Sequence, residues 1–306
     1  MVLNTFDETN NKRIFKCYFD SINDLLSAVE TRPINTEIFD PVNLNSERPG
    51  PNYLNKTKDL QEAINLCRYG VSKEELRNFI DLNDYMENIL PNFMQKRNII
   101  HNMYGYRPDV YKFLNGNPKS MYQLKRKTPK KSINILMLPN FYGKHIGSVI
   151  INLGVSVIQL VKLLEMAGYS VSIYYLDVSR QWDKSDDSLN RKEEFFLYEV
   201  LIKDNNQKIN PVASYFPMCH PDFTRRLIFR ITETLPFSLK EWSSDYGMTV
   251  SDINSYMNYF ESYNNSDKKI IIDKDIVDNT KGKDIIKDFS NLLDKINFES
   301  YLVEDQ

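Results

Sequence analysis

The sequence has little cysteine, and its few cysteines stand far apart. Cys17, Cys67 and Cys219 show no C-x-x-C spacing. An odd, scattered set of this kind is typical of reduced thiols inside a cell. It excludes a disulfide framework and a cysteine-rich zinc site.

Long hydrophobic runs are also missing. No apolar run free of charge reaches about 18 residues, the length that a membrane-spanning helix requires. Residues 1–30 contain no uninterrupted apolar core of the kind found in signal peptides. We therefore expect a soluble protein that is not secreted through a signal peptide and that has no membrane partner.

The sequence lacks an excess of either charge, and it lacks the common nucleotide and nucleophile motifs. Its 39 basic residues are balanced by 41 acidic ones, so no overall field attracts nucleic acid or membranes. The patterns G-x-x-x-x-G-K-[ST], G-x-G-x-x-G and G-x-S-x-G are absent. We expect no cofactor, and any nucleic-acid contact must come from a local patch.

What is present suffices for a folded core, since 42% of the 306 residues are hydrophobic and 12% are aromatic. Residues 1–131 predict a mainly helical region with an extended loop and a connector. Thr57 is the expected cap of a helix that Gly70 ends, and Ser72 begins a capping box for another. The expected elements are a strand at 13–19, helices at 20–30, 57–70 and 72–91, and a loop at 31–55.

The pattern changes at residue 132. A continuous apolar run at 133–139 predicts a strand covered on both faces, a long apolar helix follows at 146–170, and a second strand follows at 171–178. Strand, helix and strand in this order predict a parallel pair with a right-handed crossover. Further strands are expected at 195–203 and 268–277. The fold class predicted for 132–306 is α/β, with a parallel Rossmann-like sheet flanked by helices.

Four motifs, in order along the chain, resemble an uncharacterised family of bacteriophage proteins, a domain of unknown function. They are "EAINLCRYG", "GYRPDVYKFLNGNP", "KLLEMAGYSVSIYYL" and "HPDFTRRLIF". The resemblance covers most of the chain and carries no named activity. It implies a viral protein that acts in the host cytoplasm or in the virion.

Residues 132–306 also resemble a von Willebrand A-type Rossmann domain. Such domains place Asp-x-Ser-x-Ser after the first strand to hold a divalent cation. Here the corresponding turn is "LPNFYGKHIGS", with Pro139 where the metal aspartate would stand. Because a hard cation needs anionic oxygen ligands, the resemblance implies an A-type scaffold that has lost its metal.

Our first hypothesis is therefore a phage-encoded, non-enzymatic interaction or scaffold protein. It would use this metal-free A-type domain to bind a protein partner or to self-assemble. The contact surface would be the loops "NFYGKH" and "SRQW" at the strand ends, with Phe141, Tyr142 and Trp182 as anchors. Lys144 and His145 stand where a helix N-terminus could receive an anion.

The stretch 103–131 joins many aromatic residues to a basic run. We interpret it as a connector in which Asp109 caps a short helix, Gly116 ends it, and Val110, Phe113 and Leu114 pack on the sheet. The alternative is a nucleic-acid site in which tyrosines stack on bases and basic side chains hold phosphates. Its basic residues would be Arg107, Lys125, Arg126, Lys127, Lys130 and Lys131.

Two further groups of residues could form a functional site, and each also has a simpler structural explanation. Asp273, Asp275 and Asp278 could serve a metal-dependent hydrolase or nuclease, but charges on a solvated edge strand explain them more simply. In "HPDFTRR", His220 could be a catalytic group. The simpler interpretation is a helix junction, in which His220 is a cap and the arginines bind nearby carbonyls.

Overall fold

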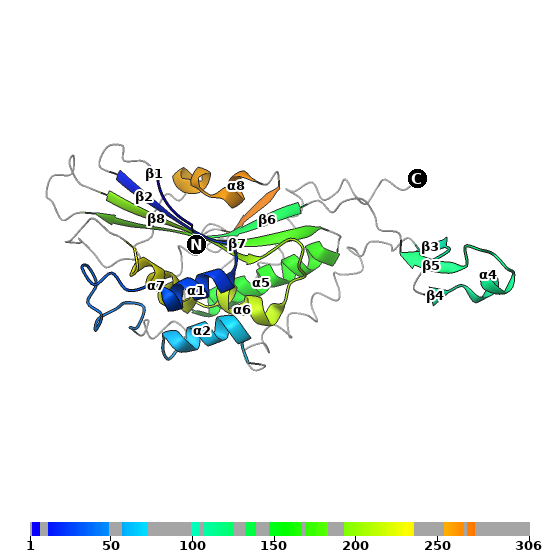
Figure 1. Cartoon of the computed structure of the whole chain (residues 1–306), viewed down its shortest axis with the longest axis horizontal. Coiled ribbons are helices and arrows are strands. Elements are labelled where there is room, and N and C mark those ends of the chain that lie inside the picture. Colours follow the sequence, from blue (N-terminus) through cyan, green and yellow to red (C-terminus); the bar gives the residue numbers. More distant parts are fainter. Residues whose placement is uncertain are drawn as a thin grey trace.

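One six-stranded sheet separates two layers of helices in the computed structural model (Figure 1). The structure describes residues 2–6, 12–48, 57–72, 99–104, 107–124, 132–138, 147–166, 169–182, 193–235, 254–265 and 268–272. Structural statements below concern these residues.

The main sheet has the strand order β1-β2-β8-β7-β6-β9. The pairs β2–β8, β6–β7 and β6–β9 are parallel, whereas β1–β2 and β7–β8 are antiparallel. The strands are β1 (Val2–Phe6), β2 (Lys12–Phe19), β6 (Ser132–Met137), β7 (Ser170–Trp182), β8 (Glu193–Lys203) and β9 (Lys269–Ile272).

The predicted crossover unit is confirmed. The strand β6, the helix α5 (Gly147–Met166) and the strand β7 follow one another, and β6 pairs with β7 in parallel from Ser132 opposite Ser170 to Met137 opposite Tyr175. β9 lies parallel on the other side of β6. The α/β class is therefore correct.

The expectation of a wholly parallel sheet is wrong at β8, which is antiparallel to β7. Only residues 183–192 join these two strands. A parallel crossover needs a dozen or more residues, usually with a helix, whereas an antiparallel return does not. The length of the connection therefore accounts for the direction of β8.

The mainly helical N-terminal region is not confirmed. β1 and β2 belong to the main sheet, so that sheet takes strands from both sides of residue 132. Phe15, Cys17 and Phe19 alternate along β2 and are completely buried. Pairing with β8 brings β2 into the sheet, and the face with this pattern is covered by residues of the helix layer such as Leu25, Leu26 and Val29.

Most helices cover one face of the sheet, and a shorter layer covers the other (Figure 1). The shorter layer consists of the 3-10 helix η3 (Asn254–Tyr259) and α8 (Glu261–Asn264). The larger layer holds α1 (Ile22–Thr31), α2 (Leu60–Tyr69), α5, α6 (Pro211–Cys219), the π-helix η2 (Phe223–Ile228) and α7 (Phe229–Thr232). None of the described helices is both long and apolar enough to span a bilayer.

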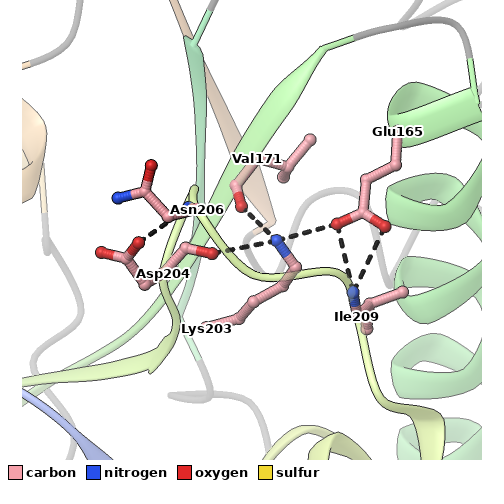
Figure 2. A network of polar contacts seen from close by, with 6 residues as sticks. All are labelled: Glu165, Val171, Lys203, Asp204, Asn206 and Ile209. Carbon is pink, nitrogen blue, oxygen red and sulfur yellow. Dashed lines mark hydrogen bonds and ion pairs between the residues drawn. The ribbon is translucent and has the colours of Figure 1, made fainter. Parts of the chain in front are cut away.

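A buried lysine joins the ends of four elements. Lys203, the last residue of β8, is 4% exposed. Its Nζ lies 2.8 Å from Glu165 Oε1 and donates to the carbonyls of Val171 at 2.6 Å and Asp204 at 3.1 Å (Figure 2). Glu165 of α5 also accepts from the backbone N–H of Ile209, just before α6. The network therefore fixes α5, β7, β8 and the start of α6 together.

A buried arginine fastens the N-terminal loop to η2. Arg226 is 1% exposed and donates to the carbonyls of Ser46 at 2.8 Å and Thr57 at 3.0 Å. The predicted hydrogen bonds from the arginines of "HPDFTRR" to nearby carbonyls are confirmed for Arg226. His220 is the C-cap of α6. Thr57 was wrongly predicted to cap α2. Asp59 caps it, because the Thr57 hydroxyl instead bonds Asp222 at 2.8 Å.

Candidate functional site

A second, smaller sheet forms a unit that we call the aromatic module, residues 99–124. It contains β3 (Ile99–Asn102), β4 (Arg107–Pro108), α4 (Val110–Leu114) and β5 (Met121–Leu124), with the strand order β3-β5-β4. In Figure 1 it projects from one end of the molecule. Among the described elements, β3, β4 and β5 pack extensively only on one another.

Asp109 is the polar centre of the aromatic module. Its side chain accepts from the backbone N–H of Lys112 at 3.2 Å and so caps α4, as predicted. Its Oδ2 lies 2.8 Å from His101 Nε2 on β3, and its own N–H donates to the Ser120 carbonyl at 2.7 Å. The Lys112 N–H, and then His101, lower the pKa of Asp109. Asp109 therefore links β3 and α4 through its carboxylate, and the residue before β5 through its backbone N–H.

Aromatic contacts add to this framework. The His101 ring lies 4.8 Å from the Tyr122 ring, between centroids. The Arg107 guanidinium lies 5.7 Å from the centroid of the Tyr122 ring, a cation–π arrangement. Arg107, named above for the nucleic-acid alternative, is solvent-exposed and sits on this small sheet.

The apolar side chains of the aromatic module face solvent. Phe113 is 64% exposed and Leu114 is 76% exposed. The prediction that Val110, Phe113 and Leu114 pack on the sheet is therefore wrong. The large apolar side chains exposed here are Met103, Tyr104, Val110, Tyr111, Phe113 and Leu114.

The described side chains of the aromatic module form hardly any core. Ser120 is the one buried residue among those of 101–122 whose side chains are described, and α4 buries none. Short strands and a single-turn helix are marginal in water unless an apolar face is covered. Exposed apolar patches rimmed by polar residues are typical of interaction sites. The arrangement therefore has the properties of a docking element.

The aromatic module also begins a strongly basic segment. Residues 99–131 contain eight lysines and arginines and one aspartate, a net charge of +7. Subtracting these from the chain's 39 basic and 41 acidic residues leaves 31 and 40, a net charge of −9. Lys125, Arg126, Lys127, Lys130 and Lys131 lie outside the described residues. The chain is thus close to neutral as a whole but divided in charge along its length.

The predicted contact loops at the main sheet are only partly described. Phe141, Tyr142, Lys144 and His145 lie outside the described residues. Trp182 is the last residue of β7, and Met137 at the end of β6 pairs with Tyr175. Trp182 lies seven residues beyond Tyr175 on β7, which is about 23 Å along the strand at roughly 3.3 Å per residue. The end of β6 and Trp182 are therefore not brought together.

One family model matches residues 7–297, and its description is "Domain of unknown function (DUF7192)". The chain belongs to this family. The expected resemblance to an uncharacterised family is confirmed at this level, and the match includes the main sheet from β2 onward and the aromatic module. No curated protein and no solved structure matches the DUF7192 chain.

The other candidate groups that the structure describes show no assembled centre. Among the described residues, no three histidine, cysteine or acidic side chains lie close enough to hold a metal. Asp273, Asp275 and Asp278 lie outside those residues. His220 accepts the Asp222 N–H at Nδ1 and stacks on Phe216 with centroids 4.8 Å apart. That geometry is what the helix-junction interpretation requires.

Buried titratable groups lie on β2, β7 and β8. Burial raises the pKa of Asp177 to about 7 and that of Cys17 to about 12. Burial raises the pKa of Tyr198 as well, and its hydroxyl lies 2.6 Å from that of Thr232. Asp177 and Tyr198 are register partners on β7 and β8. Sequence reasoning did not single out Asp177, because one polar residue in an apolar strand carries no motif.

The exposed face of α4 is the feature that sequence reasoning missed. Val110, Phe113 and Leu114 stand at i, i+3 and i+4 and share one helix face about 100° wide, a pattern that ordinarily predicts burial. The local sequence therefore carries no signal that this face is exposed.

Proposed function

We propose that this protein is an interaction component that docks on a partner protein through the aromatic module. The observation that carries the proposal is a capped and paired folded element whose large apolar side chains are exposed. Such an element gains its missing core when a partner covers it. The proposal assigns the docking to α4 and the residues around it, not to the loops at the main sheet.

The exposed groups favour a particular kind of partner surface. Phe113 and Leu114 fit an apolar depression, and the +7 charge of residues 99–131 favours an acidic rim around it. Val110, Leu114 and Met103 are not aromatic and cannot stack on bases as tyrosine does. These three side chains favour a protein partner over nucleic acid.

The proposal keeps two expectations from the sequence resemblances. The part from residue 132 would be a von Willebrand A-like scaffold without its cation, which the crossover β6–α5–β7 supports. The protein would act in a phage-infected cell or in the virion. In this role the main sheet carries the aromatic module and performs no catalysis.

The test is proximity capture from cells that make the protein. A variant with Phe113→Ser and Leu114→Ser should lose its specific partner, because both replaced side chains are exposed and make up the docking face. Tyr69→Ser is the matched control, since Tyr69 is 74% exposed on α2, outside the aromatic module. Quantitative mass spectrometry compares the captured proteins. An unchanged captured set in the double variant would contradict the proposal.

Nucleic-acid binding is the second candidate, favoured by the basic charge together with Tyr104 and Tyr111, which are each 78% exposed. Fluorescence polarisation with single-stranded oligonucleotides tests it. Binding should weaken steeply with salt, and reversal of Lys125, Arg126 and Lys127 to glutamate should reduce the salt slope. No binding at low salt would remove this candidate.

A further inference from the structure

We infer that the partner of the aromatic module is a second copy of this chain, bound at the end that carries Val42. The inference rests on the proposed function, because it names the occupant of the docking face proposed above. Its observations are the division of charge, the exposure of Val42, and the positions of the two surfaces.

Contact between two aromatic modules is disfavoured by their charge. The aromatic module carries Arg107, Lys112 and Lys119 against Asp109, a net charge of +2, and the basic run of residues 125–131 follows it in the sequence. Like charges that face each other oppose binding. The rest of the chain carries −9. Charge complementarity therefore directs the aromatic module of one copy to the remainder of another, which is a head-to-tail contact.

Val42 is the most exposed large apolar side chain that the structure describes, at 92%. The loop that carries it is nevertheless well anchored. Phe39 and Leu44, on either side, are buried, and the buried Ser46 donates from its N–H to Glu233 Oε1 at 2.9 Å. An apolar side chain held out by a fixed loop presents a preformed contact at little entropic cost.

The loop between Phe39 and Ser46 also suits a basic partner. Of the exposed charged residues between 37 and 48, Glu37, Asp40 and Glu47 are acidic and Arg48 is basic. Asp40 fixes the local turn by accepting the Val42 N–H at 3.0 Å. An apolar centre with acidic neighbours complements an apolar face with basic neighbours. The two surfaces therefore match in both properties.

The two surfaces cannot meet within one chain as it is folded. The loop that carries Val42 lies at the end of the molecule opposite the aromatic module (Figure 1). A contact between them is therefore made between copies. A heterologous contact of this kind produces either a closed ring or an open chain of subunits.

The experiment measures molar mass by light scattering during size-exclusion chromatography. The wild-type protein should form species larger than one chain at low salt. They should dissociate at about 0.5–1 M salt, where charges are screened over a few ångströms. Leu114→Glu alone and Val42→Lys alone should each give a single chain. Tyr69→Lys, the matched control, should keep the wild-type mass.

Mixing the two single variants tests the head-to-tail geometry. The Leu114→Glu copy retains its Val42 surface, and the Val42→Lys copy retains its aromatic module. An equimolar mixture should therefore form a species of two chains and nothing larger. A contact between two aromatic modules would instead let the Val42→Lys copy self-associate on its own, because its module is intact, and that result would overturn the inference.

The outcomes separate this inference from the proposed function. If the wild-type protein stays a single chain while Phe113→Ser with Leu114→Ser still loses another captured protein, the self-partner is wrong and the proposed function stands. If neither experiment depends on the aromatic module, both fail. Circular dichroism of every variant confirms that the fold is intact before either result is used.

Discussion

Replacing Lys203 by methionine is expected to destabilise the fold strongly. In the wild-type protein, the ammonium group is satisfied by Glu165, Val171 O and Asp204 O, and its side chain is 3% exposed. Methionine fills a similar volume but donates no hydrogen bond. The substitution leaves the Glu165 carboxylate, 14% exposed, without its cation, and leaves two carbonyls without this donor.

The magnitude follows from what remains uncompensated. Removing one member of a buried ion pair typically costs about 3–5 kcal/mol. We expect Lys203→Met to lower the free energy of unfolding by that amount. The variant with Lys203→Met and Glu165→Leu should recover part of the loss, since no buried charge is then left unpaired. The partial recovery distinguishes a charge effect from a packing effect.

Urea denaturation followed by circular dichroism measures these differences. The matched control is Arg68→Met, because Arg68 pairs with Glu30 at 2.9 Å while both side chains are more than a third exposed. An exposed pair of this kind contributes little to stability, because solvent screens it. If Lys203→Met costs no more than Arg68→Met, the described network does not hold the four elements together.

Three further predictions concern other parts of the structure. The pKa of Asp177 is about 7 in the folded state and about 4 in the unfolded state. Between pH 4 and pH 7 the unfolded state has lost this proton and the folded state keeps it, so the free energy of unfolding falls as pH rises through that range. Asp177→Asn should remove about 2–3 kcal/mol of this fall between pH 5 and pH 8, measured by urea denaturation at those two pH values, and an unchanged pH dependence would refute the assignment. Gly154→Ala should lower the free energy of unfolding by about 1–3 kcal/mol, because a Cβ there would meet Cys219 Sγ at 2.3 Å and Met218 O at 2.6 Å. An unchanged melting temperature would exclude this close approach. Asp109→Ala should loosen the aromatic module without lowering the temperature of the main melting transition, because it removes the contacts to His101 and to the Lys112 N–H. Nuclear magnetic resonance should then show changed chemical shifts for the amides of the module, and unchanged shifts would contradict the role given to this carboxylate.

The sequence was most informative where one local pattern determines one element. Ser21 caps α1, Gly70 ends α2 with a φ of 82°, and Asp109 caps α4, as their residue types indicate. The strand–helix–strand order predicted β6, α5 and β7 because apolar runs separated by a long apolar helix have few other stable arrangements.

The sequence was less informative where distant segments meet. Nothing local to residues 13–19 indicates that they pair with 193–200, which follow them by about 180 residues. Thr57 has the residue type of a cap, but its partner Asp222 is 165 positions away. The candidate site was missed for the same reason, since Phe113 and Leu114 were assigned to a neighbour that lies elsewhere in the fold.

The central claim is that the apolar face of the aromatic module is uncovered within its own chain and is covered by another. Hydrogen–deuterium exchange at increasing protein concentration tests this most directly. We predict fast exchange of residues 110–116 in dilute protein, and slower exchange of these residues together with residues 40–44 in concentrated protein. Strong protection of residues 110–116 at the lowest concentration would contradict the claim, because it would mean that the chain covers this face by itself.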